Sequence, residues 1–164
     1  MQLIDQYLRN VNYLRVSVTD RCDLRCVYCM KEKMQFLPKK EILTLEEIER
    51  LCDNFIELGV EKIRITGGEP LVRNDIIKLI EKLNHKKNDT SLKEITLTTN
   101  GTLLKKYAKQ LKLNGIDRIN LSLDTINPDK YNKITRFGNI KKVFQGIDEA
   151  LQNNIKIKIN TVVI

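Results

Sequence analysis

Two hydrophobic periods alternate along the chain. Segments in which every second residue is apolar, as in half-buried strands, are separated by segments whose apolar residues recur with the period of a helix. The expected strands are Tyr13–Thr19, Glu61–Thr66, Glu94–Thr99, Asp117–Asp124 and Ile155–Val163. The expected helices are one from Thr44 to Gly59, one capped by Asn74 and reaching Leu83, one from about Leu103 to Leu113, a short one at Pro128 and one from about Ile140 to Asn153.

This order of strands and helices predicts an α/β fold with right-handed crossovers and a mainly parallel sheet. A parallel sheet that is covered on both faces normally has continuously apolar strands. Here each strand keeps one polar face, as in Leu14-Arg15-Val16-Ser17. The alternation therefore predicts a partial (βα) barrel of five parallel strands, with the helices outside and a polar lumen for a polar substrate. A sheet with one face open to solvent is the alternative.

Composition restricts the class of protein. The chain has 164 residues, 41% hydrophobic and 30% charged, which is typical of one globular domain over 1–164. The net charge of +8 favours anionic partners, but the basic residues are scattered and only 5% of residues are aromatic, which argues against nucleic acid. No apolar run reaches the roughly 20 residues of a membrane span, and the amino terminus lacks the apolar core of a signal peptide. We therefore expect a cytoplasmic protein that binds neither nucleic acid nor membranes.

Three cysteines follow the first expected strand directly. Cys22, Cys26 and Cys29 have the spacing C-x3-C-x2-C, and thiolates favour zinc or iron–sulfur centres. A structural zinc site needs a fourth ligand, but Cys52 lies on an apolar helix stripe and His85 lies in a polar stretch at a helix end. Three thiolates would instead leave one iron of a four-iron cluster open, which suits catalysis. A zinc-binding interaction module is the alternative.

The cysteine spacing resembles the signature of the radical S-adenosylmethionine (radical SAM) superfamily. Thr66-Gly67-Gly68-Glu69-Pro70, after the second expected strand, is similar to that superfamily's GGE(P) segment. The resemblance implies that the three cysteines ligate a [4Fe-4S] cluster, that its open iron chelates S-adenosylmethionine, and that reductive cleavage of this cofactor gives a 5′-deoxyadenosyl radical. Glycines without a Cβ allow the backbone to approach a ligand closely. Glu69 is expected either to hold the cofactor amine indirectly or to stabilise the Gly-Gly turn.

A narrower resemblance is to the GTP 3′,8-cyclase family of molybdenum cofactor biosynthesis. It covers nearly the whole chain and is carried by Leu14–Cys22, Phe36–Pro38, Ile42–Thr44, Lys62–Leu71, Leu97–Gly101 and Asn120–Asp124. It implies a lyase in which the adenosyl radical starts the cyclisation of GTP to (8S)-3′,8-cyclo-7,8-dihydroguanosine 5′-triphosphate. The positions that match S-adenosylmethionine contacts of the family are Tyr28, Gly68 and Ser122. Those that match GTP contacts are Arg15, Arg64, Thr98 and Lys158, and the alternation of the strands places all four on the polar face.

The resemblance also implies an electron donor such as flavodoxin or ferredoxin. Members of the family continue into a sixth strand and a C-terminal region with a second three-cysteine cluster. We therefore expect residues 1–164 to form an incomplete radical SAM core, truncated before the sixth strand, that binds the cluster but catalyses little cyclisation. The last expected strand would then be an open edge that favours self-association, for example as a homodimer. A peptide-modifying radical SAM enzyme is the second enzymatic alternative.

Overall fold

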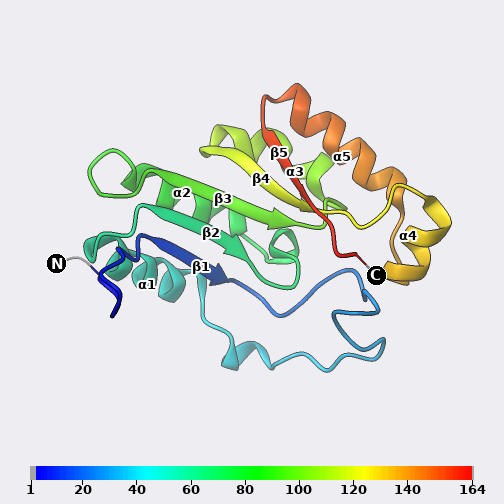
Figure 1. Ribbon diagram of the computed structural model, residues 1–164, viewed down its shortest axis with the longest axis horizontal. Coiled ribbons are helices and arrows are strands. Elements are labelled where there is room, and N and C mark those ends of the chain that lie inside the picture. Colours follow the sequence, from blue (N-terminus) through cyan, green and yellow to red (C-terminus); the bar gives the residue numbers. More distant parts are fainter. Residues whose placement is uncertain (1–2, 164) are drawn as a thin grey trace.

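The computed structural model describes residues 3–163 and contains one sheet of five parallel strands in the order β1-β2-β3-β4-β5 (Figure 1). The strands are β1 Tyr13–Ser17, β2 Lys62–Thr66, β3 Glu94–Thr99, β4 Ile116–Ser122 and β5 Lys156–Asn160. The helices are α1 Leu45–Glu57, α2 Ile76–Lys86, α3 Leu104–Leu113, α4 Pro128–Thr135 and α5 Ile140–Gln152, with short 3-10 turns at η1 Lys39–Glu41 and η2 Pro70–Val72. The predicted partial barrel with outer helices is confirmed. The sheet is open, so its polar face forms one wall of the predicted lumen.

The amino-terminal caps show where local sequence decided the helix start and where it did not. Thr44 and Glu47 form the predicted capping box, in which the Glu47 N–H donates to Thr44 Oγ1 at 3.1 Å and the Thr44 N–H to Glu47 Oε2 at 2.7 Å. The predicted cap of α2 by Asn74 is wrong, because Asp75 is the cap residue. Asp75 has a φ of 60° and makes no side-chain cap bond; its carboxylate instead pairs with Lys78 at 2.8 Å.

The fifth strand is shorter than the sequence pattern predicts. It ends at Asn160 rather than Val163, although the apolar and β-branched residues continue. Beyond Asn160, hydrogen bonds that involve side chains take the place of the backbone bonds between β4 and β5. Thr161 Oγ1 donates to the carbonyl of Leu123 at 2.8 Å, and the Val162 N–H donates to Asp124 Oδ1 at 2.9 Å. The alternation predicted the side-chain faces here, but it could not predict a change of hydrogen-bond partner.

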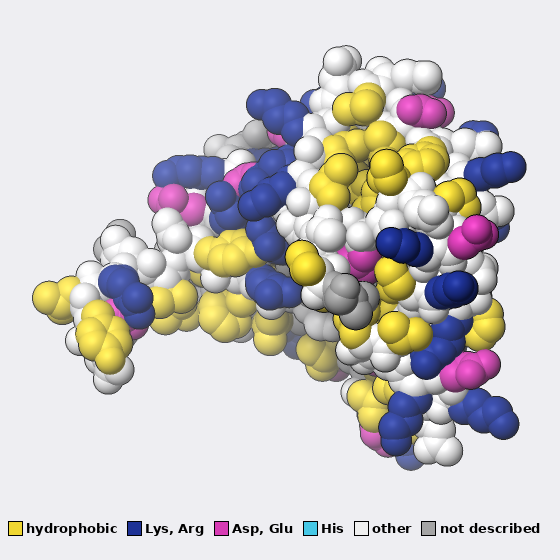
Figure 2. Space-filling model, turned by 45° about the vertical axis from the view of Figure 1, so that its right-hand side comes forward, with side chains coloured by type: hydrophobic (Ala, Val, Ile, Leu, Met, Phe, Trp, Pro, Cys, Tyr) yellow, Lys and Arg dark blue, Asp and Glu magenta, His cyan; other side chains and the backbone are white. Residues whose placement is uncertain are grey.

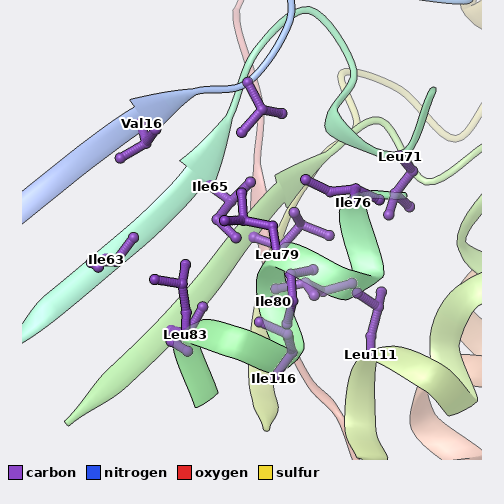
Figure 3. Close-up of a cluster of buried hydrophobic side chains, with 14 of the residues drawn as sticks. Val16, Ile63, Ile65, Leu71, Ile76, Leu79, Ile80, Leu83, Leu111 and Ile116 are labelled. Carbon is purple, nitrogen blue, oxygen red and sulfur yellow. The ribbon is translucent and has the colours of Figure 1, made fainter. Parts of the chain in front are cut away.

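The core lies between the apolar face of the sheet and a helical layer in which α1 contacts α2, α2 contacts α3 and α3 contacts α5. Ile63 and Ile65 of β2 meet Leu79, Ile80 and other residues of α2 in this layer (Figure 3). The connection from β1 to α1 runs past the carboxyl ends of the strands, which is where the three cysteines lie (Figure 1). None of the helices in residues 3–163 has both the length and the apolar character needed to cross a bilayer.

We predict that the central strand carries much of the folding free energy. Leu97 of β3 is fully buried, so Leu97→Ala should lower the free energy of unfolding by about 2–5 kcal/mol through lost contacts and the cavity left behind. Leu113 at the end of α3 is 73% exposed and is the matched control. Leu113→Ala should change the free energy of unfolding by less than about 0.5 kcal/mol. Urea unfolding of the two variants makes the comparison. Equal losses would contradict this account of the core.

Candidate metal-cluster and cofactor site

The three predicted cysteine ligands lie on the loop that leaves the carboxyl end of β1. All three are free thiols; Cys22 and Cys26 are partly buried and Cys29 is exposed. The N–H groups of Cys29 and Met30 both donate to the Cys26 carbonyl, at 2.9 and 3.1 Å, and so form a tight turn between the second and third cysteines. Within residues 3–163, no three histidine, cysteine or acidic side chains are gathered tightly enough to hold a single metal ion. A four-iron cluster is bound through separate irons, so its thiolates need not converge on one point, and this donor set fits it.

The surroundings of the thiols favour their protonated form. Burial raises the pKa of Cys22 to about 11, and burial also raises the pKa of Cys26, to which the neighbouring Cys29 adds a negative charge. Metal ligation requires thiolates, so binding of a cluster must displace these protons.

The loop is tied to the end of β3 by a polar network. Asn100 Nδ2 lies 3.7 Å from Cys22 Sγ and donates to Asp23 Oδ1 at 2.8 Å. The Thr102 hydroxyl donates to the other oxygen of Asp23. The pattern of the sequence did not indicate a role for these residues. Asn100 follows directly after a predicted strand and belongs to the Leu97–Gly101 segment of the family resemblance, and these two signals could have identified it.

The Gly-Gly segment after β2 touches the cysteine loop with its backbone. The Gly68 N–H donates to the Thr19 carbonyl at 2.7 Å, and the Glu69 N–H donates to the Arg21 carbonyl at 2.8 Å. A Cβ at Gly68 would lie 2.3 Å from the Arg21 carbonyl oxygen. A side chain at this position would therefore push the loop away one residue before Cys22. This contact explains why glycine is needed at position 68 without reference to any ligand.

Glu69 joins the ends of β2 and β3. Its carboxylate is fully buried and accepts hydrogen bonds from the Asn100 N–H at 2.7 Å, the Thr99 hydroxyl at 2.8 Å and the Leu71 N–H at 3.1 Å. Of the two roles that the sequence left open, these bonds support stabilisation of the turn. Burial raises the pKa of Glu69 to about 7, although the three donors act in the opposite direction.

The predicted cofactor residues gather at the carboxyl edge of the sheet. The Tyr28 hydroxyl donates to Asp124 Oδ2 at 2.7 Å, which brings the cysteine loop to the end of β4, where Ser122 lies. Burial and the hydrogen bond to Asp124 both raise the pKa of Tyr28. Gly68 lies at the carboxyl end of β2, so Tyr28, Gly68 and Ser122 share the edge that carries the three cysteines.

The four residues matched to GTP contacts lie in two rows on the polar face. Arg15 is the register partner of Arg64, and in the other row Thr98 pairs with Asn120, which pairs with Lys158. Arg15 and Lys158 are exposed, whereas Arg64 is partly buried. The guanidinium carbon of Arg64 lies 5.2 Å from the centre of the Tyr13 ring.

Three buried polar atoms on this face lack a hydrogen-bond partner within the described residues. They are Arg64 Nε, Thr96 Oγ1 and Asn120 Nδ2. Thr96 and Asn120 are almost completely buried, and the sequence analysis did not select them. Toward the amino ends of the strands, a cavity of about 540 Å³ is lined by Tyr13, Lys62, Arg64, Glu94 and Arg118, among others. The face therefore offers buried hydrogen-bonding groups and cations to a polar ligand.

The segment that ends α4 lies on the other side of the cysteine loop. The Arg25 N–H donates to the Thr135 carbonyl at 3.1 Å, and the Val27 N–H donates to the Ile134 carbonyl at 2.9 Å. Tyr131 of α4 is 3% exposed, and its hydroxyl has no partner within the described residues. Burial raises the pKa of Tyr131, and the negative charge of Cys26 is the next largest cause. A buried hydroxyl without a partner near the thiols fits a site built for a further group.

Comparison with known proteins agrees with this geometry. The family model of the radical SAM superfamily matches residues 16–164. The chain belongs to the radical SAM superfamily. Membership implies a [4Fe-4S] cluster and S-adenosylmethionine as cofactors.

Curated relatives include a GTP 3′,8-cyclase of Mesorhizobium japonicum, 54% identical over 99% of this chain and 49% of the relative. A GTP 3′,8-cyclase of Rhizobium etli is 59% identical over 98% of this chain and 46% of the relative. The chain thus spans about half the length of the curated relatives it matches. Solved structures with the same fold include SuiB of Streptococcus suis bound to S-adenosylmethionine, with a TM-score of 0.76 and 22% identity over 92% of this chain and 33% of SuiB. Native anSMEcpe with bound AdoMet has a TM-score of 0.71 and 22% identity over 90% of this chain and 42% of that protein.

We predict that Glu69 makes the metal-free radical SAM chain less stable as the pH rises from about 4.5 to about 7. A carboxyl group whose pKa is about 7 when folded and 4.5 when unfolded binds its proton more tightly in the folded state. Its contribution is therefore most favourable below about pH 4.5 and is lost as the pH rises to about 7, by up to about 3 kcal/mol. Glu69→Gln should remove this component of the pH dependence, which urea unfolding between pH 5 and pH 8 would measure. An identical pH profile for the variant would contradict the raised pKa.

Proposed function

We propose that this chain forms the cluster- and cofactor-binding part of a GTP 3′,8-cyclase. The observation that carries the proposal is the position of the cysteine loop. The loop is hydrogen-bonded to the end of β2 through Thr19 and Arg21, to the end of β3 through Asp23, and to the end of β4 through Tyr28. The names of the curated relatives support the reaction, since each of those cited above is a GTP 3′,8-cyclase.

In this proposal Cys22, Cys26 and Cys29 hold the [4Fe-4S] cluster. When bound, the cluster supplies the electron that cleaves S-adenosylmethionine into methionine and the 5′-deoxyadenosyl radical. Tyr28, Gly68 and Ser122 bind S-adenosylmethionine at the carboxyl edge of the sheet. The Tyr28–Asp124 hydrogen bond fixes one side of that site, and the contact of Gly68 with the Arg21 carbonyl fixes the other.

The polar face is the proposed GTP site. Arg15, Arg64 and Lys158 supply cations, and Thr98 supplies a hydroxyl. These four residues lie in two register rows of the sheet. Within residues 3–163, no carboxylate lies at ion-pair distance from any of these three cations. Guanidinium groups give oriented bonds to phosphate oxygens and lysine gives a point charge, so the set suits a triphosphate.

An electron donor such as flavodoxin or ferredoxin remains part of the proposal, as does a homodimer. So do a cytoplasmic location and the expectation that neither nucleic acid nor membranes are bound. Four free thiols among the described residues suit a reducing compartment.

We predict that the chain, reconstituted without oxygen, is brown and contains about four iron and four sulfide per chain. With a chemical reductant it should release 5′-deoxyadenosine from S-adenosylmethionine. Cys22→Ala, Cys26→Ala and Cys29→Ala should each abolish both properties, because each removes one of three cluster ligands. Cys52→Ala is the matched control, since Cys52 lies on the buried face of α1 in the core, and it should retain both. A colourless protein with stoichiometric zinc would refute the proposal.

We predict that Lys158→Ala weakens GTP binding about tenfold, the loss expected for one hydrogen bond to a charged group. The variant should leave the release of 5′-deoxyadenosine unchanged, because Lys158 lies in the middle of β5 and not at the carboxyl edge that carries the cysteine loop. Lys142→Ala, on the exposed surface of α5, removes the same charge and should have no effect on binding. Titration calorimetry with GTP would give the affinities. Equal effects of Lys158→Ala on binding and on cofactor cleavage would favour a radical SAM enzyme with another substrate, such as a peptide.

A further inference from the structure

Arg136, directly after α4, has an unusual backbone. Its φ of 64° and ψ of −44° place a residue with a side chain in a region that L-amino acids rarely adopt. Such a conformation persists only where the surrounding contacts fix it. Here Thr135 fixes the turn: its hydroxyl donates to the Tyr131 carbonyl at 2.7 Å and accepts from the Gly138 N–H at 3.1 Å.

The side chain of Arg136 reaches the cysteine loop. One guanidinium nitrogen, Nη1, donates to the Arg25 carbonyl at 2.8 Å and to the Met30 carbonyl at 3.1 Å. These carbonyls belong to the residues immediately before Cys26 and immediately after Cys29. A single partly buried nitrogen therefore joins the two ends of the turn that carries two of the three thiols.

Backbone bonds reinforce the same connection. The Arg25 and Val27 N–H groups donate to the carbonyls of Thr135 and Ile134. Four hydrogen bonds thus run between residues 134–136 and residues 25–30, two from the backbone and two from the guanidinium. The guanidinium bonds span 111 and 106 residues of sequence, so the turn depends on a distant part of the chain.

We propose that Arg136 is a positioning residue that holds the Cys26–Cys29 turn closed, so that both thiols are presented to the cluster before it binds. This inference rests on the proposed function for its link to the cluster. Its structural part, the ordering of the turn, holds for the metal-free chain. A bound cluster with thiolate ligands adds negative charge at this turn, and the arginine supplies a fixed positive charge beside it.

The test uses four variants. Arg136→Gln keeps much of the length but removes the guanidinium. Arg136→Gly removes it as well and relieves the backbone conformation. Arg136→Lys keeps a cation with a shorter reach. Arg50→Gln, at an exposed position on α1, is the control for loss of a positive charge.

The first measurement is hydrogen exchange of the metal-free chain. The amides of Arg25, Val27, Cys29 and Met30 should exchange roughly tenfold faster or more in Arg136→Gln and Arg136→Gly, because ordering of the turn is lost. Exchange in the sheet should stay unchanged. Arg136→Lys should restore part of the protection, and Arg50→Gln should match the unsubstituted chain.

The second measurement is the loss of iron to a chelator after reconstitution, together with the electron paramagnetic resonance spectrum of the reduced protein. Arg136→Gln should release iron roughly tenfold faster and show a broadened spectrum, with partial rescue in Arg136→Lys. Unchanged exchange at the four amides would overturn the inference. So would uniformly faster exchange throughout the chain, or normal iron retention despite a loosened turn. If even the unsubstituted chain took up no cluster, the proposed function would fail, and the exchange data alone would decide the role of Arg136.

Discussion

The site depends on one close backbone contact, between Gly67-Gly68 after β2 and Thr19–Arg21 after β1. Two hydrogen bonds hold this contact, and there is no room in it for a Cβ at Gly68. From it the connection continues across the sheet: Glu69 bonds to Thr99 and Asn100 at the end of β3, and Asn100 reaches back to Cys22 and Asp23. The cysteine loop thus rests on three successive strand ends. Buried polar bonds in such a closed network support one another, and losing one leaves its partners unpaired.

The other side of the loop is supported differently. There the contacts come from the end of α4, through two backbone bonds and the guanidinium of Arg136. The bonds from Gly68, Glu69 and Arg136 act on the backbone of the loop, whereas the contacts with Asn100 and Asp124 involve its side chains. Backbone support suits a ligand loop, because it orders the loop without using the thiols.

Hydrophobic periodicity was sufficient to predict the architecture. β3 matches its prediction at both ends, and the buried Ile63 and Ile65 lie on the face that the alternation assigned to the core. The predictions that were wrong have local causes. The cap of α2 moved from Asn74 to Asp75 because the chain enters that helix through a left-handed residue, which no residue type there requires. The proximity of the three candidate cysteine ligands and the polar face of the sheet could be predicted, because their residues are close in sequence or alternate along a strand. The contacts of Arg136 and Asn100 could not, since each involves residues of the cysteine loop that lie far away in sequence.

The distribution of charge on the polar face favours an anion at one level of the sheet over another. Near the amino ends of the strands, Glu94 pairs with both Lys62 and Arg118, and Glu61 pairs with Lys93. In the register row that contains Arg118, Arg64 lies beside the buried Thr96, and Arg64 and Thr96 both have polar atoms without a partner in the described residues. Figure 2 shows a run of Lys and Arg side chains on the left of the main body, with others scattered over its right side. Cations whose charge is already balanced add little attraction for a ligand, whereas unbalanced ones on a partly buried face are screened less by solvent. The proposed GTP site therefore lies between the paired charges at the amino ends of the strands and the cysteine loop at their carboxyl ends.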